Sequence, residues 1–182
     1  DVCSSDLYKK GRKMRFLLTI LATVMFICSF STTAYCASED SEGNLSVPRM
    51  VSLRSSLINA RSGPGSRYPI AWVYKQKGAP VEIVAEFELW RKIKDWEGTE
   101  TWVHKAMLSG RRFVRVINPG ENNIYAKPDI SSRITAKVED GVVGEVEQCL
   151  TPDGMCLIKF DNVKGYMPRV ALFGIYKDEV IK

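Results

Sequence analysis

The feature that most constrains the fold of this chain is an internal repeat of short segments, offset by 63 or 64 residues. The paired segments are 59–64 with 123–128, 70–74 with 134–138, and 78–83 with 141–146. A later pair, Trp102-Val103 and Tyr166-Met167, follows the same offset. A repeat of this period predicts two similar units in tandem, joined between Gly110 and Val114.

The segments inside each unit have the composition of β-strands. They are short, rich in β-branched and aromatic residues, and separated by Gly, Pro, Asp and Asn, without the periodicity of a long helix. In the first unit we expect strands at 50–53, 57–61, 70–74, 80–87, 90–94 and 101–104, then one helical turn at 105–108. This pattern is typical of a small β-barrel. We therefore predict an all-β chain with a flexible lead-in at 37–49, a first barrel at 50–110 and a second, degenerate barrel at 111–182.

The first 36 residues have the pattern of a leader. The opening residues look like translated adapter sequence, so we expect 1–13 to be non-native and the natural chain to start at Met14. A basic residue, an apolar run over 16–30 and small residues after it predict a secretory signal peptide at 14–36, cleaved after Cys36. Cleavage after Ala34 or Ala37, a retained membrane anchor and a lipidated cysteine are the alternatives. The apolar run is shorter than the about 20 residues of a spanning helix, which favours cleavage and a periplasmic protein.

The charge balance argues against nucleic-acid binding. The chain has 26 Lys and Arg against 21 Asp and Glu, but five of the basic and two of the acidic residues precede residue 37. The remainder has a net charge of only +2, which removes the main compositional support for a nucleic-acid partner. Arg111, Arg112 and Arg115 form the one tight basic cluster. We expect an exposed linker there, with a contact to anionic wall polymer or lipid as the alternative.

Two cysteines follow the leader, Cys149 and Cys156. They flank Thr151-Pro152-Asp153-Gly154, a turn sequence with Pro at its first central position. In a hairpin closed by this turn Cys149 faces Cys156, close enough for a disulfide. Export permits oxidation, so we predict the disulfide, with two buried free thiols as the alternative.

The residues after the leader hold no catalytic or metal-binding pattern. His104 is the sole histidine of the chain, whereas a catalytic triad or a metal site brings several such groups together. Neither a Gly-x-Ser-x-Gly sequence nor a phosphate-binding loop is present. The carboxylates of Asp95, Glu97 and Glu100 fall near a hairpin tip, where we expect solvated charges. We expect no catalytic residues, no metal and no cofactor.

The candidate ligand-binding residues lie in the first unit, and they are Arg61, Arg67, Tyr68, Trp90 and Trp96. The first three belong to the strand and loop around Gly63-Pro64-Gly65, where glycine allows positive φ and proline fixes its own φ. An ordered loop with ordinary surface charges is the alternative. Trp90 and Trp96 flank a hairpin and suit an exposed aromatic contact, with a tryptophan-filled core as the alternative. Trp102, beside Val103, is the expected core member.

These segments make the first unit resemble a known family, the exported bacterial SH3-like domain proteins. The residues that carry the resemblance are Val51–Arg54, Asn59–Ile70, Trp90–Ile93 and Trp102–His104. Residues 50–110 resemble the family closely and 111–182 more loosely. The resemblance implies tandem SH3-like barrels, no catalytic residues, and binding of peptidoglycan or its stem peptides.

We therefore expect a non-catalytic extracytoplasmic binding module that acts through its first SH3-like barrel. Its partner would be a cell-wall polymer or an envelope protein, and it would touch the membrane only through an uncleaved signal. A protein–protein adaptor of the envelope is the alternative function. A small cell-wall hydrolase is the least favoured one.

Overall fold

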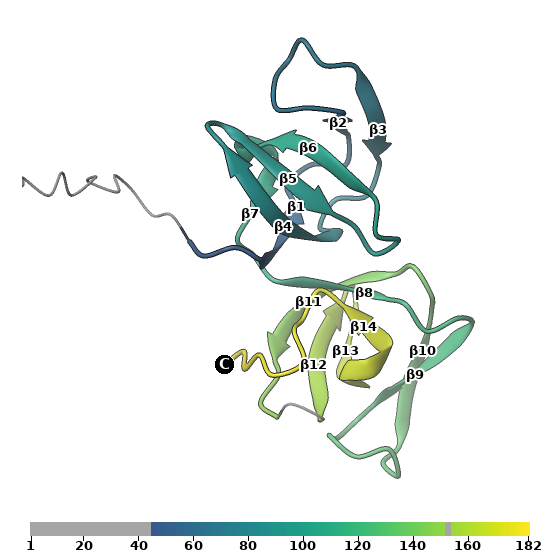
Figure 1. The fold of residues 1–182 in the computed structure, drawn as a ribbon. Helices are drawn as coiled ribbons and strands as arrows, with labels where there is room; N and C mark the ends of the chain where they lie inside the picture. The colour runs from purple at the N-terminus through teal and green to yellow at the C-terminus, as the bar shows by residue number, and fades with distance from the viewer. Residues whose placement is uncertain (1–44, 152–153) are drawn as a thin grey trace, which may run out of the picture. The chain divides into compact units, whose positions relative to one another are not determined.

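The computed structural model describes residues 45–151 and 154–182 (Figure 1). The expected non-native leader and signal peptide lie outside the described residues, as do Pro152 and Asp153 of the expected turn. Residues 45–182 form one compact unit. In the described part of the chain, no helix has the length and hydropathy needed to cross a membrane.

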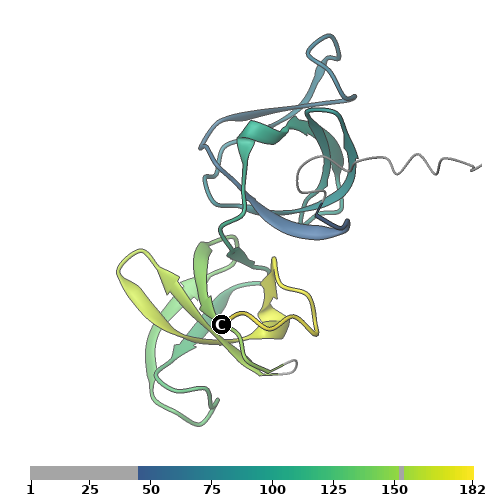
Figure 2. The ribbon, with the colours of Figure 1, turned by 90° about the vertical axis from the view of Figure 1, so that its left-hand side faces the viewer.

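The first half of this unit is a seven-stranded antiparallel sheet that curves into a barrel (Figure 2). Its elements are β1 (Arg49–Leu53), β2 (Ile58–Arg61), β3 (Ile70–Tyr74), β4 (Pro80–Phe87), β5 (Trp90–Lys94), β6 (Glu100–His104), the 3₁₀ helix η1 (Lys105–Met107) and β7 (Leu108–Ser109). The strands pair in the order β3-β2-β6-β5-β4-β1-β7. The six strands expected from the sequence are confirmed, each end within one residue.

The second half repeats this arrangement strand for strand. Its elements are β8 (Phe113–Val116), β9 (Glu121–Tyr125), β10 (Ile134–Glu139), β11 (Val143–Gln148), β12 (Met155–Phe160), β13 (Val163–Pro168), η2 (Arg169–Ala171) and β14 (Leu172–Phe173). The order β10-β9-β13-β12-β11-β8-β14 is that of the first sheet. The register repeats too, because β2 pairs with β6 at Arg61 and Trp102, and β9 pairs with β13 at Tyr125 and Tyr166. Equivalent positions on these strands are therefore 64 residues apart.

Each half has its own apolar core, because alternate side chains of its strands point inward. The largest fully buried side chains are Leu53, Ile58, Ile83, Ile93 and Val103 in the first half, and Ile124, Ile158 and Met167 in the second. In β6, Thr101 and Val103 are buried and Trp102 between them is only half-buried. The expectation that Trp102 belongs to the core is therefore wrong, since the strand's alternation turns it outward.

The loop that follows β2 has a backbone that recurs after β9. Its three backbone hydrogen bonds run from Ser62 N to Pro69 O (3.1 Å), Gly65 N to Gly63 O (3.0 Å) and Tyr68 N to Gly65 O (3.2 Å). The second loop has the same bonds 64 residues later, Ala126 to Arg133 (2.9 Å), Asp129 to Lys127 (2.7 Å) and Ser132 to Asp129 (3.0 Å). The two loops therefore share one conformation with different side chains.

Position 63 requires glycine because the Tyr68 side chain closely approaches its backbone. A Cβ at this position would lie 2.5 Å from Cδ1 of the Tyr68 ring. Glycine allows positive φ, but neither Gly63 nor Gly65 adopts it, since the positive-φ residues of the described chain lie elsewhere. In the second loop Ser132 takes the place of Tyr68, so Lys127 fits where the first loop has Gly63.

Cys149 and Cys156 form a disulfide in the second half. The pairing of β11 with β12 continues as far as Gln148 opposite Leu157, which brings the two cysteines next to each other. The backbone of Cys149 then pairs with Ile181, with N–H···O distances of 2.8 and 3.0 Å. The expected hairpin pairing therefore stops before Cys149, because the backbone of Cys149 is hydrogen-bonded to the C-terminal segment instead.

The arginines between the halves are engaged, and the expectation of an exposed linker is wrong for Arg112 and Arg115, which are half-buried. Arg111 is exposed but holds the Glu145 carboxylate through two nitrogens. Arg112 is half-buried between Glu179 and the carbonyl of Gly174, 2.7 Å away. Arg115 donates to Oε1 of Gln76 at 2.8 Å.

Candidate binding faces of the two halves

Cross-strand pairing places five side chains on one outer surface of the first barrel. Trp102 of β6 lies opposite Arg61 of β2 and Lys92 of β5, and His104 lies opposite Trp90. Directly opposed residues project from the same side of a sheet. All five are half-buried. We call Arg61, Trp90, Lys92, Trp102 and His104 the basic face.

Most side chains of the basic face are held by defined contacts. The rings of Trp90 and His104 meet edge to face, with centroids 5.7 Å apart. Nδ1 of His104 accepts a hydrogen bond from the Ala106 amide at 3.2 Å, so His104 is the N-cap of η1. Lys92 forms an ion pair with Glu100, and this hydrogen-bonded pair lowers the pKa of the Glu100 carboxyl. The face is thus a fixed aromatic surface with cationic groups.

The loop residues named as candidates gather beside Arg61. Nη1 of Arg61 donates to the carbonyl of Tyr68 at 2.6 Å. Tyr68 is half-buried against Gly63, and the guanidinium carbon of the exposed Arg67 lies 5.3 Å from the centre of its ring. The structure therefore brings Arg61, Arg67 and Tyr68 together at the edge of the basic face.

Trp96 lies apart from these residues. Its ring meets Tyr74 edge to face at 6.3 Å, and the guanidinium of Arg115 stacks over it at 4.1 Å. Trp96 is only partly exposed and packs against the core of the first half. The candidate set therefore changes, because Trp96 is covered by an arginine of the second half and Trp102 stands on the face in its place.

The carboxylate of Asp95 is buried, and the expectation of a solvated charge is wrong for it. Asp95 is 4% exposed. Its Oδ1 accepts from the amides of Glu97 (3.0 Å) and Thr99 (2.9 Å), and Oδ2 accepts from the Tyr74 hydroxyl (3.0 Å). Burial is the main cause that raises the pKa of Tyr74 to about 12. Asp95 therefore holds the hairpin between β5 and β6, and the described residues contain no cluster of acidic, His or Cys side chains suited to a metal ion.

The same surface of the second barrel carries no charge at the equivalent positions. Tyr166 of β13 lies opposite Tyr125 of β9 and Leu157 of β12, and Pro168 lies opposite Met155. These five residues are half-buried like their counterparts. We call Tyr125, Met155, Leu157, Tyr166 and Pro168 the neutral face. No pattern in the sequence alone had marked it as a site.

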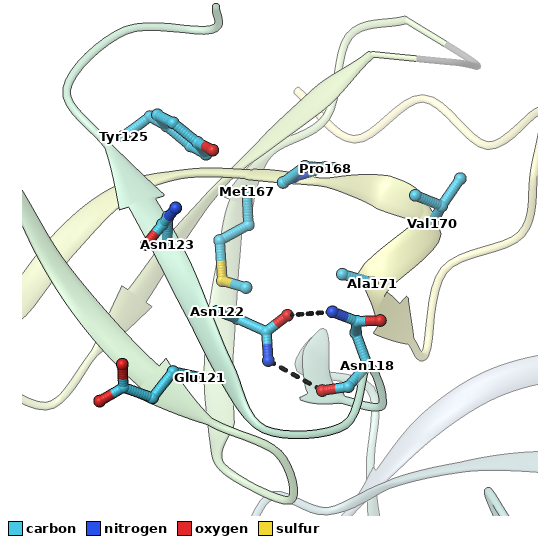
Figure 3. Close-up of a pocket in the computed structure, with 9 residues that line it drawn as sticks. All are labelled: Asn118, Glu121, Asn122, Asn123, Tyr125, Met167, Pro168, Val170 and Ala171. Atoms are coloured by element: carbon cyan, nitrogen blue, oxygen red, sulfur yellow. Dashed lines mark hydrogen bonds between the residues drawn. The ribbon is translucent and has the colours of Figure 1, made fainter. Parts of the chain in front are cut away.

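Two pockets open beside the neutral face. The first, of about 300 Å³, lies where β9 and β13 separate beyond their paired tyrosines (Figure 3). Tyr125 and Asn123 stand on one side of it, Val170 and Ala171 on the other, and Met167 between them (Figure 3). The second pocket, of about 330 Å³, is lined by Pro128, Gln148, Leu150, Thr151, Gly154, Met155 and Tyr166. Each pocket thus contains one tyrosine of the pair.

The wall of the first pocket is fixed by two asparagines. The amide of Asn118 donates to Oδ1 of Asn122 at 2.8 Å, and the amide of Asn122 donates to the carbonyl of Asn118 at 2.8 Å (Figure 3). The Asn122 amide also donates to the carbonyl of Gly120 at 2.9 Å. Glu121 also lines the pocket, and its carboxylate pairs with Lys137 at 2.7 Å. The wall is therefore preformed, and its one acidic group is neutralised.

Two kinds of comparison with known proteins gave matches, one with solved structures and one with a family model. No curated protein matches the chain. Among solved structures, the chain is similar to NlpC2 from Trichomonas vaginalis, with 17% identity and a TM-score of 0.31 over 71% of this chain and 49% of that one. NlpC1 from the same organism gives 17% identity and a TM-score of 0.32 over 72% and 47% of the two chains. The chain spans about half the length of these structures, and a likeness at this TM-score supports no conclusion on activity.

A family model gives the more specific result. The model of the bacterial SH3 domain matches residues 54–110. This range contains β2 to β7 and every residue of the basic face. The match agrees with the family that the sequence segments resemble. Residues 54–110, in the first half of the compact unit, therefore match the bacterial SH3 domain family.

Proposed function

We propose that the protein is a non-catalytic, extracytoplasmic binding module that recognises peptidoglycan, or its peptides, through the basic face of its first half. The family match supports this proposal, because bacterial SH3 domains are binding domains. The observation that carries it is the grouping of Arg61, Trp102 and Lys92 across three paired strands. Such a grouping presents cations and aromatic rings together on a rigid support.

The chemistry of the basic face suits a peptide with free carboxylates. A guanidinium presents several donors in a plane that matches a carboxylate, and Arg61 has donors left after its bond to Tyr68. Tryptophan contributes a large apolar contact at low entropic cost and is frequent among residues that dominate binding energy. Since the strands hold these side chains before a ligand arrives, little ordering is needed on binding.

The residue types most often used in catalysis have structural roles in this protein. His104 caps η1, Asp95 ties down a hairpin, and Cys149 is bonded to Cys156. These roles support a binding protein rather than a hydrolase. The disulfide also supports export to an oxidising compartment, and we place the protein in the periplasm.

Co-sedimentation of the full chain with purified sacculi tests this proposal. Arg61→Ala and Trp90→Ala are each expected to weaken binding by about tenfold, which corresponds to about 1.4 kcal/mol. Matched controls are Arg133→Ala, at an exposed arginine of the second half, and Trp72→Ala, at a half-exposed tryptophan outside the face. Both controls should bind like the unmodified protein.

Three results would count against wall binding by this face. They are retention no higher than that of serum albumin, equal losses in the face variants and the controls, and a loss that tracks a lower unfolding midpoint. If sacculi do not bind but cross-linking in cells recovers one stoichiometric envelope protein, the adaptor function replaces the proposed one.

A further inference from the structure

We propose that the neutral face of the second half is a separate binding site for an uncharged oligosaccharide. Tyr125 and Tyr166 would be its stacking platform, and the two adjoining pockets would receive sugar units on either side. The inference rests on the proposed function in one respect, since wall glycan is the natural source of such a chain. The ligand class itself comes from the chemistry of the face.

Equivalent positions of the two halves differ in charge. Strand pairing places Tyr125 where the first half has Arg61. By the same pairing Leu157 replaces Lys92. The five uncharged side chains of the neutral face offer no ion pair to an anionic peptide, so the ligand they contact should be uncharged.

The tyrosine pair is flanked by the two pockets. Directly opposed residues of antiparallel strands have Cβ atoms about 5 Å apart, so Tyr125 and Tyr166 project from neighbouring points of one surface. One pocket of about 300 Å³ contains Tyr125, and another of about 330 Å³ contains Tyr166. A linear chain of units can therefore cross the tyrosine pair with one part in each pocket.

The groups that line these pockets are of two kinds. Pro168 and Val170 contribute apolar surface, and Asn123 and Gln148 contribute amides. Within the described residues, the side-chain hydrogen bonds of the first pocket are those of Asn118, Asn122 and the Glu121 carboxylate. The amide of Asn123 and the tyrosine hydroxyls therefore have donors and acceptors to offer. A sugar has an apolar ring face and hydroxyl edges, and this lining matches both.

The wall of the first pocket contains a polar residue at a position that is apolar in the first half. Asn122 occupies the position of Ile58, a core residue that is 1% exposed, and is itself 7% exposed. A buried amide destabilises a core unless its hydrogen bonds are made. Asn122 makes three, all within the loop that ends at Gly120. The second half has thus exchanged an apolar core residue for one that shapes the pocket wall.

Calorimetric titration of the full chain with a hexamer of β-1,4-linked N-acetylglucosamine tests the inference. Binding is expected to change less than about twofold when salt is raised from about 0.05 to 0.5 M, because no charges are paired. Tyr125→Arg should weaken it at least about tenfold. This variant copies Arg61, which the same backbone position already carries in the first half. Tyr166→Trp, which copies Trp102, should keep binding within about threefold because an aromatic platform remains.

The controls separate this site from the basic face. Arg61→Ala and Trp102→Ala should leave hexamer binding unchanged. Lack of hexamer binding while sacculi still bind would overturn the inference and leave the proposed function in place. Hexamer binding without sacculus binding would overturn the proposed function and keep the inference. The inference would also be overturned if Tyr125→Arg bound the hexamer as tightly as the unmodified protein does. Full competition with the hexamer by an uncharged alanine tetrapeptide would overturn it too.

Discussion

Alanine at Gly63 is expected to destabilise the first half, whereas alanine at Gly65 is not. A Cβ at Gly63 would lie 2.5 Å from Cδ1 and 2.6 Å from Cε1 of Tyr68. At Gly65 the nearest ring atoms would be 3.4 Å away, which is an ordinary contact. Neither glycine has a positive φ, so the comparison isolates the ring contact from any backbone strain.

The expected cost follows from how far the ring must move. To restore an ordinary contact, Tyr68 has to shift by about 1 Å, and overpacking of this kind costs about 1–3 kcal/mol. Its backbone is held by the bond to Gly65 and by Arg61, so the loop resists the shift. Replacing glycine by alanine also lowers the conformational entropy of the unfolded chain, which stabilises the folded protein by about 0.4–1 kcal/mol. The net loss at Gly63 is then about 1–2 kcal/mol, while Gly65→Ala should be neutral or stabilising by up to about 1 kcal/mol.

Urea unfolding followed by tryptophan fluorescence measures this loss in the first half, because all four tryptophans lie there. A second background completes the test. Tyr68→Ser copies Ser132, the residue that lies opposite Lys127 in the other loop. In that background Gly63→Ala should be neutral or stabilising, as at Gly65, so the coupling energy should equal the overpacking cost of about 1–3 kcal/mol. Equal costs at both glycines, or a cost that survives Tyr68→Ser, would refute the reasoning.

Three further predictions concern stability. Burial raises the pKa of Tyr74 to about 12, so the stability that the protonated hydroxyl contributes should be complete below about pH 10 and lost as the pH rises towards about 12. Urea midpoints measured across this pH range should fall less in Tyr74→Phe than in the unmodified protein. Arg169 is 6% exposed and donates to three backbone carbonyls, so Arg169→Met should lower the stability of the C-terminal segment by about 2–4 kcal/mol in hydrogen exchange. Replacing Cys149 and Cys156 by serine should cost about 2–3 kcal/mol in the exchange of β12 amides.

The strands of this protein are predictable from sequence because each half encodes them locally. Gly, Pro, Asp and Asn separate the apolar segments, and β3, β4 and β5 begin and end at the expected residues. The alternation within a strand also predicts its outward side chains. Applied to β6, it would have turned Trp102 outward, since Thr101 and Val103 on either side of it are buried.

Features that depend on distant residues could not be read in this way. Trp96 is covered by Arg115, a residue of the other half. Asp95 is buried beside Tyr74, a residue of another strand that supplies one of its three hydrogen bonds. Glycine is needed at position 63 because the ring of Tyr68, five residues further along the chain, packs against it, and not because of a local turn. The neutral face has no motif of its own, and it became visible only when strand pairing matched it to the basic face.

The two faces together imply a gain in affinity that neither has alone. Both halves belong to one compact unit, so a polymer bound by one face is held near the other. A second binding event of this kind gains from its effective concentration, and avidity can exceed the separate affinities by about 10²–10⁴. Peptides and glycan occur on one wall polymer, whereas under the two proposals an isolated peptide or hexamer would engage one face only. Variants that remove either face should therefore lose more affinity for sacculi than the weak affinity of that face alone accounts for. The reason is that the lost face no longer holds the polymer close to the other face.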